Sequence, residues 1–313
     1  MRYNKVFFIL KLFVSLLSLF LLFYNIGFTR VFSLLYETKI SLILLSLLFY
    51  TVVLLLGAFG LYIFFRALNV KPSFFSFFGK YALGWSYASF TPAKLGEFGL
   101  MYLLKKYTTY GQSLAILLLE KLISFFSYGL LSVIGLVWLV NRNAALIVSI
   151  FMILVLSLIA VSFSLTLRNF VKKYILRKYA EKFRLFHQTF FSLLRNHRSS
   201  LLLNVFLSFL KLFLHSVLVY LLFSSAGFFV PIPKIMVIMA IVSVISFIPI
   251  SLAGLGIKEA SFVVLFTTFA SVGEPDAFAI SLLFLFTRYF ISICFLIFSK
   301  HQPLPLQETV TNS

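Results

Sequence analysis

The sequence predicts an all-α integral membrane protein with six full transmembrane helices and two oppositely inserted re-entrant helical hairpins, arranged as an inverted pseudo-repeat. Of its 313 residues, 62% are hydrophobic and only 11% are charged. The uncharged runs 40–65 and 144–167 exceed the roughly 20 residues that a helix needs to cross a hydrocarbon core about 30 Å thick. Two other apolar stretches are interrupted by short segments rich in Pro, Gly, Lys and Glu. These observations exclude a soluble globular protein.

The predicted spans are apolar runs with few or no charges. They lie at about 6–24, 40–65, 112–140, 144–167, 201–223 and 277–299. The first run follows a basic start but lacks a small-residue cleavage site, so we expect a retained helix and not a signal peptide. We expect one polytopic membrane domain over 1–300, with halves at about 1–140 and 144–300, followed by a polar tail at 301–313.

The basic residues set the expected orientation. The net charge is +19, and the Lys and Arg side chains lie mostly between apolar spans, which favours anionic lipid headgroups over nucleic acid. In the segment 168–200 the cations face a single acid, Glu181, so this segment is predicted to be cytoplasmic. Both termini are predicted to lie on the same side, the cytoplasmic side of the inner membrane. Aromatic residues at helical spacing in this segment predict an amphipathic helix on the membrane surface, although a solvated connector fits equally well.

Charge counting predicts the first hairpin. Lys71 and Lys105 fall on the same side, so the residues between them enter and leave by one face. We expect 74–90 to descend, 92–97 to turn and 98–104 to return, because two full crossings need about 40 residues. The alternative is one full span at 74–90, which would place the basic segment outside.

The second hairpin has arms of about a dozen residues at 234–248 and 260–270, followed by an acidic loop at 273–276. It enters from the opposite face. In each half a hairpin then precedes a helix that carries a charge near its middle. Sites built from discontinuous helices in inverted repeats are typical of alternating-access carriers.

The two hairpin motifs supply the first candidate site residues. A charge at membrane depth costs a few kcal/mol unless it is paired or hydrated, so each motif indicates a protein-lined or watery cavity. The glycines allow backbone amides to approach an anionic group. An ion pair that only pins each hairpin is the alternative. The residues are Pro92, Lys94, Gly96 and Glu97 in the first motif and Gly254, Gly256, Lys258 and Glu259 in the second.

Three further candidates lie inside full spans. Glu120 and Lys121 are adjacent, point to different sides of their helix and are not expected to satisfy one another. Arg288, at the equivalent place in the other half, is the expected partner of Glu120. A structural salt bridge and a substrate-binding pair both fit, and an unpaired Arg288 is well suited to a phosphate.

Other polar residues in the spans carry weaker signals. Lys211 and His215 share one helix face, and His215 fits either a proton relay or a simple hydrogen bond. With one cysteine, Cys294, and no cluster of His or Cys, we expect no transition-metal site and no disulfide.

Three motifs in this order resemble the membrane region of the lysylphosphatidylglycerol synthase/flippase family. They are Pro-x-x-x-Gly-Glu at 92–97, Glu-Lys at 120–121 and Gly-Leu-Gly-x-x-Glu at 254–259. The resemblance covers about 1–300 and implies an inner-membrane lipid translocator or binder. It places Pro92, Gly96, Glu97, Glu120, Gly254, Gly256 and Glu259 at matching positions.

The resemblance also bears on catalysis. Two-domain members carry a soluble domain that transfers an aminoacyl group to phosphatidylglycerol. This sequence ends at Ser313 without that domain, so we expect no aminoacyl-lipid synthesis by this polypeptide alone.

The sequence therefore favours flippase-like movement of a phospholipid, or another lipid with a phosphate headgroup, without a cofactor. The sequence contains no Gly-x-x-x-x-Gly-Lys-Ser/Thr motif, so we do not expect ATP to drive the movement. The expected partners are anionic membrane lipids and a lipid-modifying enzyme. The alternative is an enzyme or accessory protein in polyprenyl-phosphate glycan or aminoacyl-lipid biosynthesis, with Glu274 and Asp276 binding a divalent ion or merely forming a turn. A scaffold that recruits partners also stays open.

Overall fold

The computed structural model describes residues 20, 24, 28–91, 99–105, 107–139, 142–162, 185–247 and 255–299. Within these ranges every regular element is a helix, which confirms the all-α prediction for this part of the chain. Several predictions concern residues that lie wholly or largely outside the described ranges. They are the first span at 6–24, the first motif at 92–97, the start of the basic segment at 168–184 and the polar tail at 301–313.

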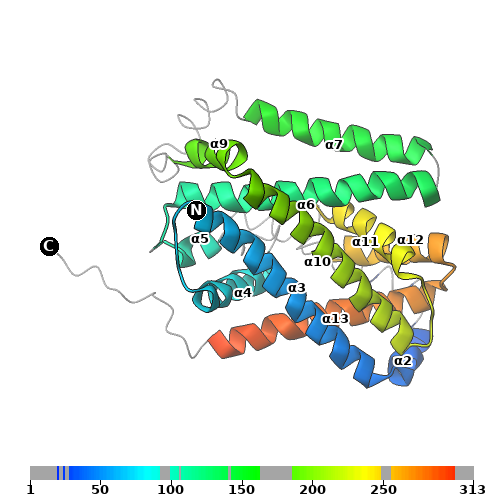
Figure 1. Ribbon diagram of the computed structural model, residues 1–313. Coiled ribbons are helices and arrows are strands. Elements are labelled where there is room, and N and C mark those ends of the chain that lie inside the picture. The colour runs from blue at the N-terminus through cyan, green and yellow to red at the C-terminus, as the bar shows by residue number, and fades with distance from the viewer. Residues whose placement is uncertain are drawn as a thin grey trace.

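The described helices range from a single turn to eight turns (Figure 1). They are α2 (Phe28–Glu37), α3 (Ile40–Ala67), α4 (Phe74–Phe90), α5 (Gly99–Leu103), α6 (Tyr110–Leu139), α7 (Arg142–Ser162), α9 (Phe186–Asn196), α10 (Arg198–Ser225), α11 (Ile232–Ser246), α12 (Ile257–Ala270) and α13 (Glu274–Ser299).

Four of these helices, α3, α6, α10 and α13, are long and apolar enough to cross a membrane. They coincide with the spans predicted at 40–65, 112–140, 201–223 and 277–299. The span predicted at 144–167 corresponds to α7, in which the apolar stretch Ala145–Ser157 is shorter. The six full crossings and the opposite entry of the two hairpins stay predictions.

Local sequence signals explain where the shorter helices begin and end. The Ser73 hydroxyl accepts a hydrogen bond from the Ser76 amide at 3.4 Å and caps the start of α4. This helix ends at Phe90, and Thr91 is extended, as expected for the residue before Pro92. Pro233 lies in the first turn of α11, where its missing amide hydrogen is tolerated.

Helices α3 and α10 cross in front of the other helices in the view of Figure 1 and contact each other extensively. The two helices come close together at Gly60 because this residue has no side chain. A Cβ atom at this position would lie 2.8 Å from Asn204 Oδ1. Asn204 is buried and donates from Nδ2 to the Gly60 carbonyl at 3.1 Å, which joins the two helices by a hydrogen bond.

The helix contacts correspond between two sets, α3 to α6 and α10 to α13. The first helix of each set packs on the second, and the third packs on the fourth. Across the sets, α4 packs on α13, and its counterpart α11 packs on α6. In Figure 1, α4 and α5 lie toward the left of the view, whereas α11 and α12 lie toward the right. The two sets therefore interlock instead of forming separate bundles.

Two helices lie at the edge of the molecule. Helix α7 packs mainly against α6 and lies farthest from α13 in Figure 1. Helix α9 contacts α6 and α10 through Phe190 and Leu193, which are buried, while Arg195 is exposed. This amphipathic pattern agrees with the prediction for the later part of the basic segment, and its position on a membrane surface stays a prediction.

Candidate functional site

A polar cavity of about 200 Å³ lies where the two sets of helices meet. Its described lining comes from α3, α4, α6, α10, α11, α12 and α13. The charged residues of this lining are Glu120, Lys121, Lys211, Lys258 and Arg288. Four cationic side chains thus face a single carboxylate in the described lining.

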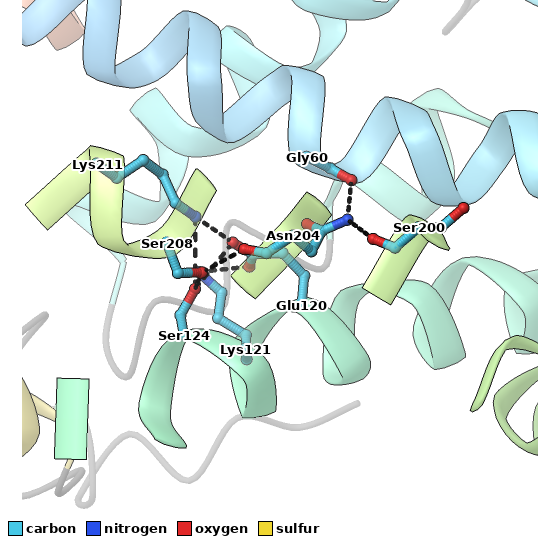
Figure 2. A network of polar contacts seen from close by, with 8 residues as sticks. All are labelled: Gly60, Glu120, Lys121, Ser124, Ser200, Asn204, Ser208 and Lys211. Carbon is cyan, nitrogen blue, oxygen red and sulfur yellow. Dashed lines mark hydrogen bonds and ion pairs between the residues drawn. The ribbon is translucent and has the colours of Figure 1, made fainter. Parts of the chain in front are cut away.

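Glu120 and Lys211 form a buried ion pair on one side of the cavity (Figure 2). Lys211 Nζ on α10 lies 2.7 Å from Glu120 Oε1 on α6, and both side chains are 9% exposed. The Ser124 hydroxyl donates to the same carboxylate oxygen at 3.2 Å. Lys211 Nζ also lies 3.4 Å from Ser124 Oγ. The carboxylate is therefore neutralised and hydrogen-bonded by its own protein.

The pair belongs to a longer polar network between α6, α10 and α3. Ser124 Oγ and Ser208 Oγ lie 3.2 Å apart, and the Ser208 hydroxyl donates to the Asn204 carbonyl at 2.9 Å. The Asn204 side chain donates to the Gly60 carbonyl, so the chain of contacts runs from the cavity to the contact between α3 and α10 (Figure 2). Hydrogen bonds of this kind hold transmembrane helices together where lipid provides no hydrophobic driving force.

The predicted pairing of Glu120 with Arg288 is wrong. Glu120 pairs with Lys211, because α6 and α10 bring these two side chains together across their contact. Glu120 and Lys121 were not expected to satisfy one another, and Lys121 Nζ lies 3.9 Å from Glu120 Oε2, too far for a hydrogen bond, whereas Lys211 Nζ lies 2.7 Å from Oε1. The flexible lysine stem bends toward its neighbour, and the Lys121 side chain remains 41% exposed.

Arg288 lies between α13 and α4. Its Nε donates to Ser89 Oγ at 3.4 Å, and the Ser292 hydroxyl donates to the same oxygen at 3.2 Å. The guanidinium carbon lies 5.7 Å from the centre of the Tyr289 ring. Arg288 is only 9% exposed, yet it lines the cavity.

Aromatic rings form another side of the cavity around Tyr50. The Tyr50 ring centre lies 5.5 Å from His215, 5.7 Å from Trp85 and 6.3 Å from Phe284. Lys258 Nζ lies 4.2 Å from the centre of the Phe284 ring, within the range of a cation–π contact. Lys258 therefore lies on the aromatic side of the cavity.

Glu259 has a local role at the start of α12. Its Oε2 accepts a hydrogen bond from the Gly256 amide at 2.6 Å, which satisfies an amide that the helix itself leaves unpaired. Gly256 has φ +83°, a conformation that favours glycine. The carboxylate is 4% exposed and does not line the cavity. This contact is a hydrogen bond to a backbone amide, so the alternative in which an ion pair pins the second motif stays a prediction.

The structure brings together part of the predicted site. Glu120, Lys121, Lys258 and Arg288 line one cavity, whereas Gly256 and Glu259 lie beside it at the start of α12. The other predicted residues, Pro92, Lys94, Gly96, Glu97 and Gly254, lie outside the described ranges.

Sequence reasoning did not choose Lys211 or the lining serines as site residues. The signal for Lys211 was a charge in the middle of an apolar span, the same signal that indicated Arg288. Ser89, Ser124, Ser243 and Ser246 line the cavity, but serine is common in these helices, and no pattern separated these four from the others.

The acidic pair considered for a divalent ion lies in the first turn of α13. There Glu274 and Asp276 are favourably placed against the helix dipole. Within the described residues, no group of three or more His, Cys, Asp and Glu side chains could hold a metal ion.

Comparison with known proteins gives one family match. The sequence model described as "Lysylphosphatidylglycerol synthase TM region" matches residues 8–295. No curated protein matches the chain. Together with the apolar helices, the match indicates a multi-pass integral membrane protein with a role that involves lipids.

Proposed function

Because this chain belongs to the family of the lysylphosphatidylglycerol synthase transmembrane region, we propose that it moves a lipid with a phosphate headgroup across the cytoplasmic membrane. The observation that carries this proposal is the set of cationic side chains in the described lining of the cavity. Lys121, Lys211, Lys258 and Arg288 are found there with one carboxylate, Glu120. Cationic groups gathered around one cavity attract an anionic group such as a phosphate.

Arg288 is the best-placed ligand for the phosphate. A guanidinium donates two parallel hydrogen bonds to phosphate oxygens, which fixes the orientation of the group. The Nε of Arg288 donates to Ser89 Oγ at 3.4 Å, which helps to orient the guanidinium in the lining of the cavity. Lys121 and Lys258 would contribute point charges from α6 and α12, while Lys211 stays with Glu120.

The position of the cavity suits transport. It lies between two interlocked sets of helices, so a shift of one set against the other would open it to one side or the other. The headgroup would occupy the cavity while the acyl chains stay in the bilayer. This proposal includes three further points. The termini lie on the cytoplasmic side, the two halves form an inverted repeat, and the protein transports its lipid without catalysing a reaction.

Reconstitution of the full chain into liposomes with a fluorescent phosphatidylglycerol tests the proposal. Chemical quenching of the outer leaflet reports how fast the labelled lipid changes sides. We expect exchange well above that of protein-free liposomes, and a loss of about tenfold or more in Arg288→Gln. The control is Arg142→Gln, which changes an exposed arginine at the start of α7 and should leave exchange intact. Exchange no faster than in empty liposomes, or unchanged in Arg288→Gln, would overturn the proposal.

A further inference from the structure

We infer that α2 lies in the headgroup region of the bilayer and contacts lipid through an aromatic face, on the membrane surface opposite Arg195 and Arg198. This inference goes beyond the proposed function and does not depend on it. Three features support it. They are the position of α2 at the ends of two long apolar helices, the division of its side chains among three faces, and the exposed apolar residues beside it.

Helix α2 lies at one end of α3 and α10, which are both long and apolar enough to cross a membrane. Helix α3 begins at Ile40, soon after α2 ends, and the Lys39 amide donates to the Ser225 carbonyl at the end of α10 at 3.0 Å. The 28 residues of α10 span about 42 Å, more than the roughly 30 Å of the hydrocarbon core. In Figure 1, α10 runs from α9 at the upper left to α2 at the lower right. Helix α2 is thus at one membrane surface, and α9 is near the other.

One face of α2 packs on the protein. Val31 is fully buried, Leu34 is buried, and Leu35 packs against the same hydrophobic cluster. These three side chains lie on one side of a helix with 3.6 residues per turn. The helix that α2 contacts is α13. Because this face is held by the protein, the orientation of the remaining surface of α2 is fixed.

The exposed side chains of α2 separate into an aromatic face and a polar face. Phe32 is 60% exposed and Tyr36 is 94% exposed, and residues four apart share one side of a helix. Ser33 and Glu37 are also exposed and have the same spacing, about 100° farther around the helix. A helix at the edge of a membrane protein that lies in the headgroup region meets protein, lipid and water on different sides. The three faces of α2 match these three surroundings.

Exposed apolar residues beside α2 indicate that lipid is what covers its aromatic face. Ile40 begins α3, and Phe229 follows the end of α10, so both lie at the same end of the molecule as α2, and both are exposed. The aromatic face therefore continues a surface that already faces the bilayer. Tyrosine is enriched at the level of the headgroups, because its ring is apolar and its hydroxyl remains hydrated. Tyr36 supplies such a ring.

Spin labelling of the full chain in liposomes of phosphatidylcholine and phosphatidylglycerol tests this inference. Cys294 is the one cysteine of the sequence, so Cys294→Ser gives a background in which one added cysteine carries the nitroxide. Ile150→Cys, at an exposed apolar position of α7, is the reference for lipid, and Glu274→Cys, at an exposed charged position, is the reference for water. The test variants are Phe32→Cys, Ser33→Cys, Tyr36→Cys and Glu37→Cys. All four side chains are exposed, so these substitutions leave the packing of α2 on α13 intact.

The measurement compares collisions of each label with oxygen, which concentrates among acyl chains, and with a water-soluble nickel chelate. We expect the ratio of oxygen to nickel collisions at positions 32 and 36 to exceed that at positions 33 and 37 by about threefold or more. The ratio at 32 and 36 should lie near that of Ile150→Cys, and the ratio at 33 and 37 near that of Glu274→Cys.

Equal ratios at the four positions would overturn the inference, because the two exposed faces would then have the same surroundings. Nickel collisions at positions 32 and 36 as frequent as those of Glu274→Cys would place the aromatic face in water and would also overturn it. Labels at 32 and 36 that are shielded from both reagents would show that a protein, such as a second copy of the chain, covers this face in place of lipid. That result would refute the inference as well.

Discussion

Glu120 and Glu259 are both buried carboxylates in an apolar chain, yet they are held in different ways. Glu120 is buried and accepts from Lys211 and Ser124, so it joins α6 to α10. Glu259 is 4% exposed and accepts from the Gly256 amide three residues earlier, so it completes the start of α12. One carboxylate therefore links two helices that are distant in sequence, and the other stabilises a single helix end.

The difference shows that buried carboxylates of this protein have different structural roles. Each is engaged by the protein, Glu120 chiefly by the cation of Lys211 and Glu259 by a backbone amide. Lys121, Lys258 and Arg288 line the cavity with Glu120. We therefore propose that the two carboxylates serve mainly the fold and that these three cations serve mainly the site.

The largest expected loss of stability comes from breaking the Glu120–Lys211 pair. Lys211→Met leaves the Glu120 carboxylate buried with Ser124 and with Lys121, whose nitrogen is 3.9 Å away. Removing one partner of a buried ion pair costs about 3–5 kcal/mol, because the remaining charge is no longer compensated. The unfolding free energy of the protein in lipid bilayers measures this loss.

The double variant Glu120→Gln/Lys211→Met is the control for that prediction. It removes both charges, so most of the lost stability should return. A single variant that loses less than about 1 kcal/mol would show that the pair contributes little to the fold.

The second prediction breaks the contact of Glu259. Glu259→Ala leaves the Gly256 amide without its side-chain acceptor and should cost about 2 kcal/mol of unfolding free energy. Glu259→Gln keeps an oxygen acceptor and should cost about half as much. Hydrogen exchange of the Gly256 amide should become faster in the alanine variant. Equal exchange in all three proteins would remove this contact from the account.

The third prediction concerns the end of the polar network, where Asn204 on α10 contacts Gly60 on α3. Gly60→Ala places a Cβ atom 2.8 Å from Asn204 Oδ1, so the asparagine must turn and weaken its bond to the Gly60 carbonyl. We expect a loss of about 1 kcal/mol in unfolding free energy. Gly99→Ala is the matched control, because a Cβ at Gly99 meets no atom within 4 Å. Similar losses of unfolding free energy in both variants would contradict a specific role for the contact between Gly60 and Asn204.

The smallest expected effect on stability belongs to the cations. Lys258→Gln/Arg288→Gln removes two like charges, and the relief of their repulsion offsets the loss of their contacts, among them the hydrogen bond to Ser89 and the cation–π contact with Phe284. The unfolding free energy should change by less than about 1 kcal/mol. A loss as large as that of Lys211→Met would place these cations among the structural contacts and erase the distinction drawn above.

Much of the fold could be predicted from the lengths of the apolar runs. The ends of α3, α6, α10 and α13 lie within a few residues of the predicted spans, because about 20 apolar residues without charges have one stable arrangement in a bilayer. Charges at membrane depth likewise indicated site residues, since Glu120, Lys121 and Arg288 of the full spans and Lys258 of the second motif all line the cavity.

The partner of Glu120 could not be predicted in the same way. Lys211 and Arg288 are both cations in the middle of apolar spans, and only the packing of α6 on α10 decides between them. The partner of Glu259 was within reach of the sequence. A glutamate three residues after a helix start commonly accepts a bond from the capping residue's amide, and Gly256 and Glu259 have that spacing.

The central claim is that the cations of the cavity bind a phosphate headgroup while the carboxylates hold the fold. Mass spectrometry of lipids that co-purify with the full chain tests it most directly, with Lys258→Gln/Arg288→Gln compared against wild type and against Arg142→Gln. The account predicts a phosphate lipid that is retained by the wild type and by Arg142→Gln and lost from the double variant. Equal retention of the same lipid by all three proteins would contradict it.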